Sequence, residues 1–293
     1  MTIILSKDET SYEFYRQEVF RYLAIFSLVF FLFLSCRNGE APKHLPVSVT
    51  FQNSPIGNYS PQQIKKDWPQ AKMLWGKLDR TLYTFRVVPS YAEIVLDKDN
   101  HVLRINYPAQ KFGPIIGAQW RSCFQSVDEA FLSYRLFIPK DFDFVKGGKL
   151  PGLAGGGGNS GGQVPTGYDG WSARLMFHEG GEVAYYLYYP EQKSKYGEYY
   201  FWTTDSIRVK LPLDRWITLT HHLKMNTPKK PDGIIEAWLN GVKVFSTNSV
   251  RFRDTCSLGI DQILFSTFFG GDSPEWAPQS SIYLLFDDFL IEK

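Results

Sequence analysis

Two pairs of polar side chains and one lysine could carry chemistry in this sequence. Ser172 and Arg174 stand two residues apart, as do Tyr186 and Tyr188, and Lys149 precedes both pairs. On a β-strand, residues two apart point to the same face. A guanidinium can grip a carboxylate through two parallel hydrogen bonds, and a phenol or an amine can exchange a proton. The spacing permits acid–base chemistry on an anionic ligand, although two tyrosines on one strand are also ordinary packing.

The elements that position these residues are predicted to be strands. If Ala173, Leu175 and Phe177 face the core, then Ser172, Arg174 and Met176 face outward. Hairpin pairing with the next strand then brings Arg174 near both tyrosines. Alternation of apolar and polar residues with period two marks the predicted strands, which are 132–139, 172–177, 182–189, 216–225 and 282–291.

The same patterns predict an all-β fold. Asn240-Gly241 lies between two alternating runs of residues 234–245, which indicates a tight hairpin. Only Pro61–Leu74 is compatible with a short helix. Many antiparallel strands with one apolar face favour a β-jelly roll sandwich of two antiparallel sheets, concanavalin-like, with a concave groove.

Composition narrows the functional classes. Aromatic residues make up 16% of the 293 residues, which suits strands and platforms for sugar rings. The net charge is only +2 and no Lys/Arg-rich run occurs, so no nucleic-acid partner is expected. We expect a monomer.

The N-terminus is predicted to be a targeting segment. Arg16 and Arg21 precede the uncharged apolar stretch Tyr22–Ser35, which has the length of a signal-peptide core. Cys36 follows, as in a lipoprotein cleavage site, so residues 1–36 are predicted to be a signal peptide with Cys36 lipidated. Plain secretion and a short membrane anchor remain alternatives. Residues 37–66 are predicted to be an extended tether and 67–293 the jelly-roll domain.

Residues 146–162 are unusually rich in glycine. Glycine at this density lets a backbone approach a ligand closely. The segment lacks the pattern of a phosphate-binding loop. It is predicted to be a substrate-covering loop that carries Lys149 at its strand-proximal end and Asn159 further along.

Several motifs together resemble polysaccharide lyase family 14. They are GGKLPGL, the glycine-rich segment, SARLMF, YYLYYP, DGIIEAWLNG, FFGGDSPEWAP and FDDF, and they cover about residues 115–293. The resemblance implies a β-jelly roll that cleaves alginate or another polyuronate. It assigns function to Lys149, Ser172, Arg174, Tyr186 and Tyr188. A histidine that some members place between the lysine and the arginine has no match here.

The resemblance therefore predicts an endo-acting lyase on an acidic polysaccharide, without metal or cofactor. The predicted catalytic residues are Lys149, Arg174, Tyr186 and Tyr188, and the predicted substrate-binding residues are Ser172, Asn159, Glu236 and Trp238. Arg174 and Lys149 would neutralise the carboxylate. A tyrosine base would need a lowered pKa, which the two cations would supply. Lys149 as base with a tyrosine as acid is the alternative.

Two other classes of protein remain open. A glycoside hydrolase needs two carboxylates at a fixed separation, but the adjacent Asp287 and Asp288 point to opposite faces and Glu236 alone is insufficient. A carbohydrate-binding module would share the sandwich without needing Lys, Arg and two Tyr together.

The remaining histidines and cysteines give weaker signals. His221 and His222 face apart and cannot form a paired metal site. Cys123 and Cys256 could pair in an oxidising compartment or stay free.

Overall fold

The computed structural model describes residues 43–73 and 91–293. The predicted signal peptide, Cys36 and the first part of the predicted tether lie outside these residues. No helix in the described ranges is long and apolar enough to cross a membrane.

Among the described residues, nine strands form one sheet and seven form another, and the paired strands are antiparallel. In spatial order the larger sheet contains β16 (Val242–Val250), β15 (Gly233–Leu239), β14 (Trp216–Lys224), β7 (Glu129–Phe137), β18 (Ile282–Glu292), β5 (Asn100–Tyr107), β4 (Ala92–Asp97) and β2 (Gly57–Asn58), with β1 (Val47–Val49) also on β18. The smaller sheet contains β11 (Glu198–Phe201), β10 (Val183–Tyr188), β9 (Gly170–His178), β8 (Gly147–Gly156), β17 (Ile260–Thr267), β6 (Ala118–Val127) and β3 (Lys72–Met73).

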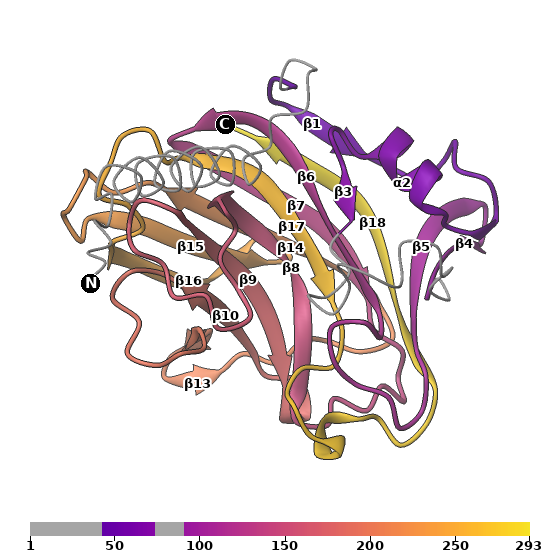
Figure 1. The fold of residues 1–293 in the computed structure, drawn as a ribbon. Coiled ribbons are helices and arrows are strands. Elements are labelled where there is room, and N and C mark those ends of the chain that lie inside the picture. Colours follow the sequence, from indigo (N-terminus) through magenta and orange to yellow (C-terminus); the bar gives the residue numbers. More distant parts are fainter. Residues whose placement is uncertain (1–42, 74–90) are drawn as a thin grey trace, which may run out of the picture. The chain divides into compact units, whose positions relative to one another are not determined.

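The two sheets form the two layers of a jelly roll (Figure 1). Alternate residues of both sheets meet in one core, for example Leu132 and Tyr134 from β7 and Leu175 from β9, all fully buried. The predicted sandwich and each predicted strand are therefore confirmed. The Asn240-Gly241 turn is confirmed as well, since both residues have the positive φ angles of a type I′ hairpin, 51° and 80°. A short ribbon, β12 (Thr203–Thr204) with β13 (Ile207–Arg208), completes the strands.

Residues 43–66 are not the extended tether that their composition predicted. Val47 and Val49 are buried where β1 pairs with β18, and helix α2 (Pro61–Asp67) lies on the same domain. Ser60 caps this helix by accepting a hydrogen bond from the Gln63 amide. Trp68, directly after α2, is fully buried against Trp120 and Phe289. The apolar residues scattered among the polar ones are what anchor this segment.

The glycine-rich stretch also differs from its prediction, because residues 147–156 form the central strand β8. Its glycines allow close packing. A Cβ on Gly148 would lie 2.3 Å from the Phe177 ring, and one on Gly152 would lie 2.1 Å from the Ala173 carbonyl oxygen. The register shifts between Leu150 and Leu153, a bulge that accommodates Pro151. The loop is thus confined to residues 157–169.

The two described cysteines do not pair with each other. Cys256 is free and exposed, whereas Cys123 is fully buried in β6. A disulfide between them is excluded.

Candidate active site

The face of the smaller sheet that points away from the core carries the predicted residues in neighbouring rows. Tyr186 of β10 pairs with Arg174 of β9, and Tyr188 pairs with Ser172. On the other side of β9, Lys149 of β8 pairs with Met176. Cross-strand partners share a face at close range. The structure thus brings Lys149, Ser172, Arg174 and both tyrosines together, on rigid strands and not on a loop.

Lys149 is a buried amine surrounded by a thioether and an aromatic ring. Its Nζ lies 2.8 Å from the Met176 sulfur and 3.9 Å from the centre of the Tyr186 ring. Only 7% of the residue is exposed, and no carboxylate of the described residues forms an ion pair with it. Burial, followed by the charge of Arg174, holds the Lys149 pKa well below its ordinary value of 10.5. A neutral amine at this position can accept a proton.

Arg174 is fixed by neutral partners. Its Nη1 donates to the Ser266 hydroxyl at 3.2 Å, and that hydroxyl donates to the Gln119 side-chain oxygen at 3.1 Å. Its Nε is buried without a hydrogen-bond partner among the described residues. A buried guanidinium that lacks a carboxylate partner is costly. The arrangement therefore leaves Arg174 available for an anionic ligand.

The two tyrosines differ from the sequence-based expectation. Their hydroxyl oxygens are 3.4 Å apart. Burial, followed by the hydrogen bond with Tyr188, raises the Tyr186 pKa, and the opposing effect of Arg174 is smaller. The predicted lowering of a tyrosine pKa by two cations is thus wrong for Tyr186. This hydroxyl stays protonated and is suited to donate a proton.

The loop 157–169 touches the site through its backbone. The Gly162 amide donates to the Tyr188 hydroxyl at 3.2 Å, and the Ser172 hydroxyl donates to the Asn159 carbonyl oxygen at 2.6 Å. The Asn159 side chain donates instead to Asp169, at 3.1 Å. Asn159 is therefore close to Ser172, while its side-chain amide is held by the loop itself.

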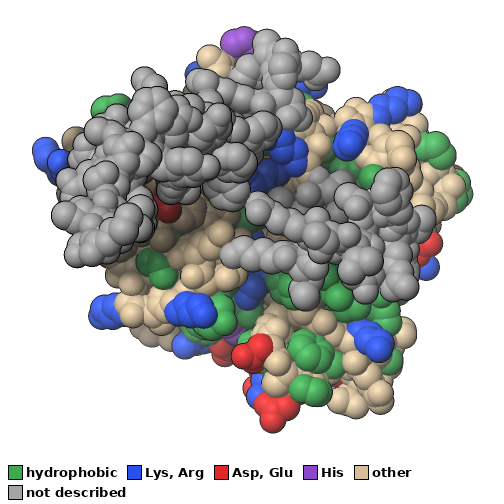
Figure 2. Space-filling view, viewed as in Figure 1, with side chains coloured by type: hydrophobic (Ala, Val, Ile, Leu, Met, Phe, Trp, Pro, Cys, Tyr) green, Lys and Arg blue, Asp and Glu red, His purple; other side chains and the backbone are tan. Residues whose placement is uncertain are grey.

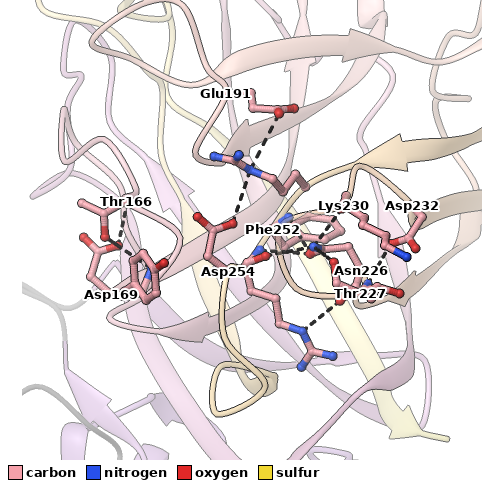
Figure 3. Close-up of polar contacts among 12 residues, drawn as sticks. Thr166, Asp169, Glu191, Asn226, Thr227, Lys230, Asp232, Phe252 and Asp254 are labelled. Carbon is pink, nitrogen blue, oxygen red and sulfur yellow. Dashed lines mark hydrogen bonds and ion pairs between the residues drawn. The ribbon is translucent and has the colours of Figure 1, made fainter.

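Asp169 and a second set of contacts hold the base of this loop (Figure 3). Asp169 accepts hydrogen bonds from both the amide and the hydroxyl of Thr166. The Asp254 amide donates to the Gly167 carbonyl oxygen at 2.8 Å. Arg251 forms ion pairs with Asp254 and Glu191, with Nε 3.5 and 3.7 Å from their carboxylate oxygens. These bonds fix the approach of the loop to Tyr188.

Sequence reasoning missed several residues of this site. Met176 is next on the same face of β9, and Trp276 of the short helix η2 (Pro274–Trp276) packs on Met176 and the tyrosines. The alternation that places Ser172 and Arg174 on the outward face also places Met176 there, but the sequence assigned Met176 no role. Trp276 lies in the motif FFGGDSPEWAP. Ser266 and Gln119 carried no sequence signal, since only the pairing of β17 with β6 reveals them.

Glu236 and Trp238 are not brought to this site. Both lie on β15 in the larger sheet, where the Glu236 carboxylate contacts His222 at 2.9 Å and Lys243 at 2.7 Å. His221 points to the face of β14 opposite to that of His222. It is fully buried, and burial lowers its pKa to about 3. In the described ranges, no group of three or more His, Cys, Asp or Glu side chains is arranged to hold a metal ion.

Positive charge is not gathered in one patch on the face that Figure 2 shows. Figure 2 shows Lys and Arg side chains distributed over the visible face, and the whole chain has a net charge of +2. This distribution does not oppose the approach of an anionic polymer.

The fold and the site define a β-jelly-roll protein with buried cationic and phenolic groups on one sheet face. A family model for polysaccharide lyase 14 matches residues 96–289. The chain therefore belongs to the polysaccharide lyase 14 family and is a polysaccharide lyase, as the motifs predicted.

Solved structures show the same fold at low identity. Alginate lyase Aly36B is 23% identical with a TM-score of 0.70, and the match covers 87% of this chain and 98% of that one. The PL-14 alginate lyase from Aplysia kurodai is 24% identical with a TM-score of 0.68, covering 84% and 98%. Alginate lyase vAL-1 from Chlorella virus is 24% identical with a TM-score of 0.59, covering 69% and 88%. No curated protein sequence matches the chain.

Proposed function

We propose that this lyase cleaves a uronate polysaccharide such as alginate or glucuronan by β-elimination, within the chain and not from its ends. The observation that carries the proposal is a buried guanidinium, Arg174, beside a buried amine, Lys149, neither of which has a carboxylate partner among the described residues. A uronate supplies that carboxylate. A double mutant of alginate lyase Aly36B, which shares the fold, has a solved structure in complex with an alginate tetrasaccharide.

The proposed reaction starts with the sugar carboxylate bound by the Arg174 guanidinium. The charge of the carboxylate otherwise opposes loss of the proton on the adjacent carbon, and the guanidinium offsets it. The neutral Lys149 amine removes that proton. The electron pair of the broken C–H bond forms the C=C bond and the glycosidic C–O bond breaks.

The leaving oxygen then needs a proton. The Tyr186 hydroxyl is protonated because burial raises its pKa, and its ring lies against Lys149. Donation from Tyr186 completes the departure, and the proton on Lys149 later returns to Tyr186. The product carries a double bond conjugated with the carboxylate, which absorbs ultraviolet light.

A panel of polyuronates tests this function directly. The wild-type protein should generate ultraviolet-absorbing oligosaccharides of mixed length from at least one of them. Lys149→Ala should reduce turnover by roughly two to four orders of magnitude. Lys149→Arg should be equally inactive, because arginine keeps the charge but cannot act as a base at ordinary pH.

The controls separate the roles of the lysine. A lysine that only neutralised charge would leave Lys149→Arg active. If the wild type binds a polyuronate and cleaves none, the protein is a binding module and the proposal fails.

We also propose export and attachment to a membrane through a lipidated Cys36, at a bacterial surface or periplasmic face. The proposal is supported by the apolar stretch 22–35 directly before this cysteine. Several acyl chains hold a protein stably at a membrane, whereas one holds it weakly. Cys36→Ser should move the protein from the membrane fraction to the soluble fraction, and unchanged fractionation would refute the anchor.

A further inference from the structure

A second cationic position lies on the same sheet face as Arg174, three strands away. Cross-strand pairing connects Arg174 through Gly152 of β8 and Leu264 of β17 to Arg121 of β6. Leu264 lies outside the main core cluster that contains its neighbours Ile263 and Phe265, so this row points away from the core. Three strand spacings amount to about 14 Å. That distance exceeds one sugar ring, so the two guanidiniums would meet different residues of one polysaccharide chain.

Like Arg174, Arg121 forms no salt bridge with a carboxylate of the described residues, although the charge of Asp261 acts on it. Its Nε is buried without a hydrogen-bond partner, and no ion pair of the described residues includes it. The charged groups that influence it are Asp261 and Lys72. The two Asp261 oxygens are held in place, because they accept hydrogen bonds from the Gly156 backbone amide at 3.2 Å and the Gln262 side-chain amide at 2.9 Å.

A complementary acceptor lies beside this guanidinium. The Gln262 side-chain nitrogen donates to Asp261 and to the Gly156 carbonyl oxygen at 2.8 Å, while its oxygen is buried and unpartnered among the described residues. Gly158 borders both groups. A Cβ there would lie 3.2 Å from the Gln262 oxygen and 3.7 Å from Arg121 Nη2. The bare glycine leaves space at the point where the donor and the acceptor meet.

We propose that Arg121 and Gln262, bordered by Gly158, form a second uronate-binding subsite. Arg121 binds the carboxylate of a sugar residue remote from the cleaved bond, and the Gln262 oxygen accepts a hydrogen bond from a hydroxyl of the same sugar. This inference rests on the proposed uronate substrate. A uronate offers both groups, whereas a neutral sugar would leave the guanidinium without an anion.

The subsite should affect long substrates more than short ones. Arg121→Ala should raise KM for the polymer about tenfold or more and leave kcat nearly unchanged, because a lost charge-assisted hydrogen bond affects binding and not the reacting atoms. The shortest cleaved oligosaccharide, bound only around Arg174, should show no change. Arg121→Lys should recover part of the loss, since it keeps charge without the planar fork.

Arg135→Ala is the matched control, because Arg135 is a half-buried arginine on the larger sheet with the same charge. Thermal melting checks that each variant is folded, and Gly158→Ala gives an independent test by filling the gap. Equal KM values for Arg121→Ala and Arg135→Ala on the polymer, or equal losses at every substrate length, would overturn the subsite while leaving the lyase function intact.

A measurement of binding alone distinguishes a failure of the subsite from a failure of the proposed lyase function. Titration calorimetry of inactive Lys149→Ala with a polyuronate oligosaccharide should show weaker binding when Arg121→Ala is added. If the wild type cleaves nothing, this measurement still decides the subsite. Unchanged binding contradicts it, and absence of any polyuronate binding rejects both proposals.

Discussion

Tyr186 and Tyr188 differ in the hydrogen bonds that their hydroxyl groups form. The Tyr188 oxygen accepts a hydrogen bond from the Gly162 amide, whereas the Tyr186 hydroxyl contacts only Tyr188 among the described residues. Tyr188 is therefore tied to the loop, and Tyr186 is free to serve the substrate. Their different partners suggest different tasks, positioning for Tyr188 and proton donation for Tyr186.

Single substitutions test this division. Tyr186→Phe removes only the hydroxyl and should lower kcat by roughly two to four orders of magnitude on the best polyuronate. Tyr188→Phe should cost about tenfold, because it removes one loop contact. Steady-state kinetics of both variants, with circular dichroism as a check of folding, measure the difference. A larger loss in Tyr188→Phe would reverse the two roles.

Among the elements, strand β8 sets the position of Lys149 relative to Arg174 on the neighbouring strand β9. Gly152 lies opposite Arg174 at the bulge, so a side chain there has no room. Gly152→Ala should destabilise the fold by about 2–3 kcal/mol and lower Tm by about 5–10 °C. It should also lower activity, because Arg174 would shift.

Gly161→Ala provides the comparison for this strand. Gly161 has a φ of 58° but nothing near its Cβ position, so the cost should be roughly 1 kcal/mol from backbone strain alone. Calorimetric melting of both variants measures the two effects. Equal Tm values would show that β8 tolerates a side chain and that its glycines serve another purpose.

Strand β8 also shows where prediction from the sequence ends. Alternation placed Arg174 and the tyrosines on one face correctly, because period two is a local property of a strand. Glycine density was interpreted as a loop, since the close approach of Phe177 and Ala173 is a tertiary contact. Glu236 satisfied the same alternation as Arg174, but no local pattern tells which of two sheets a strand joins.

At the scale of the whole molecule, the buried amine of Lys149 should lower stability. The unfolded chain binds this proton up to a pKa near 10.5, whereas the folded protein loses it at a lower pH. Stability therefore increases as pH rises through this window and falls as pH drops to the folded pKa. A protein that keeps such a group gives up stability for function.

Lys149→Met tests this cost. Methionine fills similar volume without the amine, so its Tm should exceed that of the wild type, most of all at low pH, and the difference should shrink as pH approaches 10.5. Melting curves over a pH series measure it. A difference in Tm that does not change with pH would mean that Lys149 titrates alike in the folded and unfolded states.

The free Cys256 offers a labelling site near the loop 157–169. It is exposed and lies two residues after Asp254, whose amide holds the loop at Gly167. Cys256 is the free, exposed cysteine of the described residues, so a polar maleimide dye should modify it. Its fluorescence would then report, in real time, whether the loop shifts when a polysaccharide chain arrives and departs.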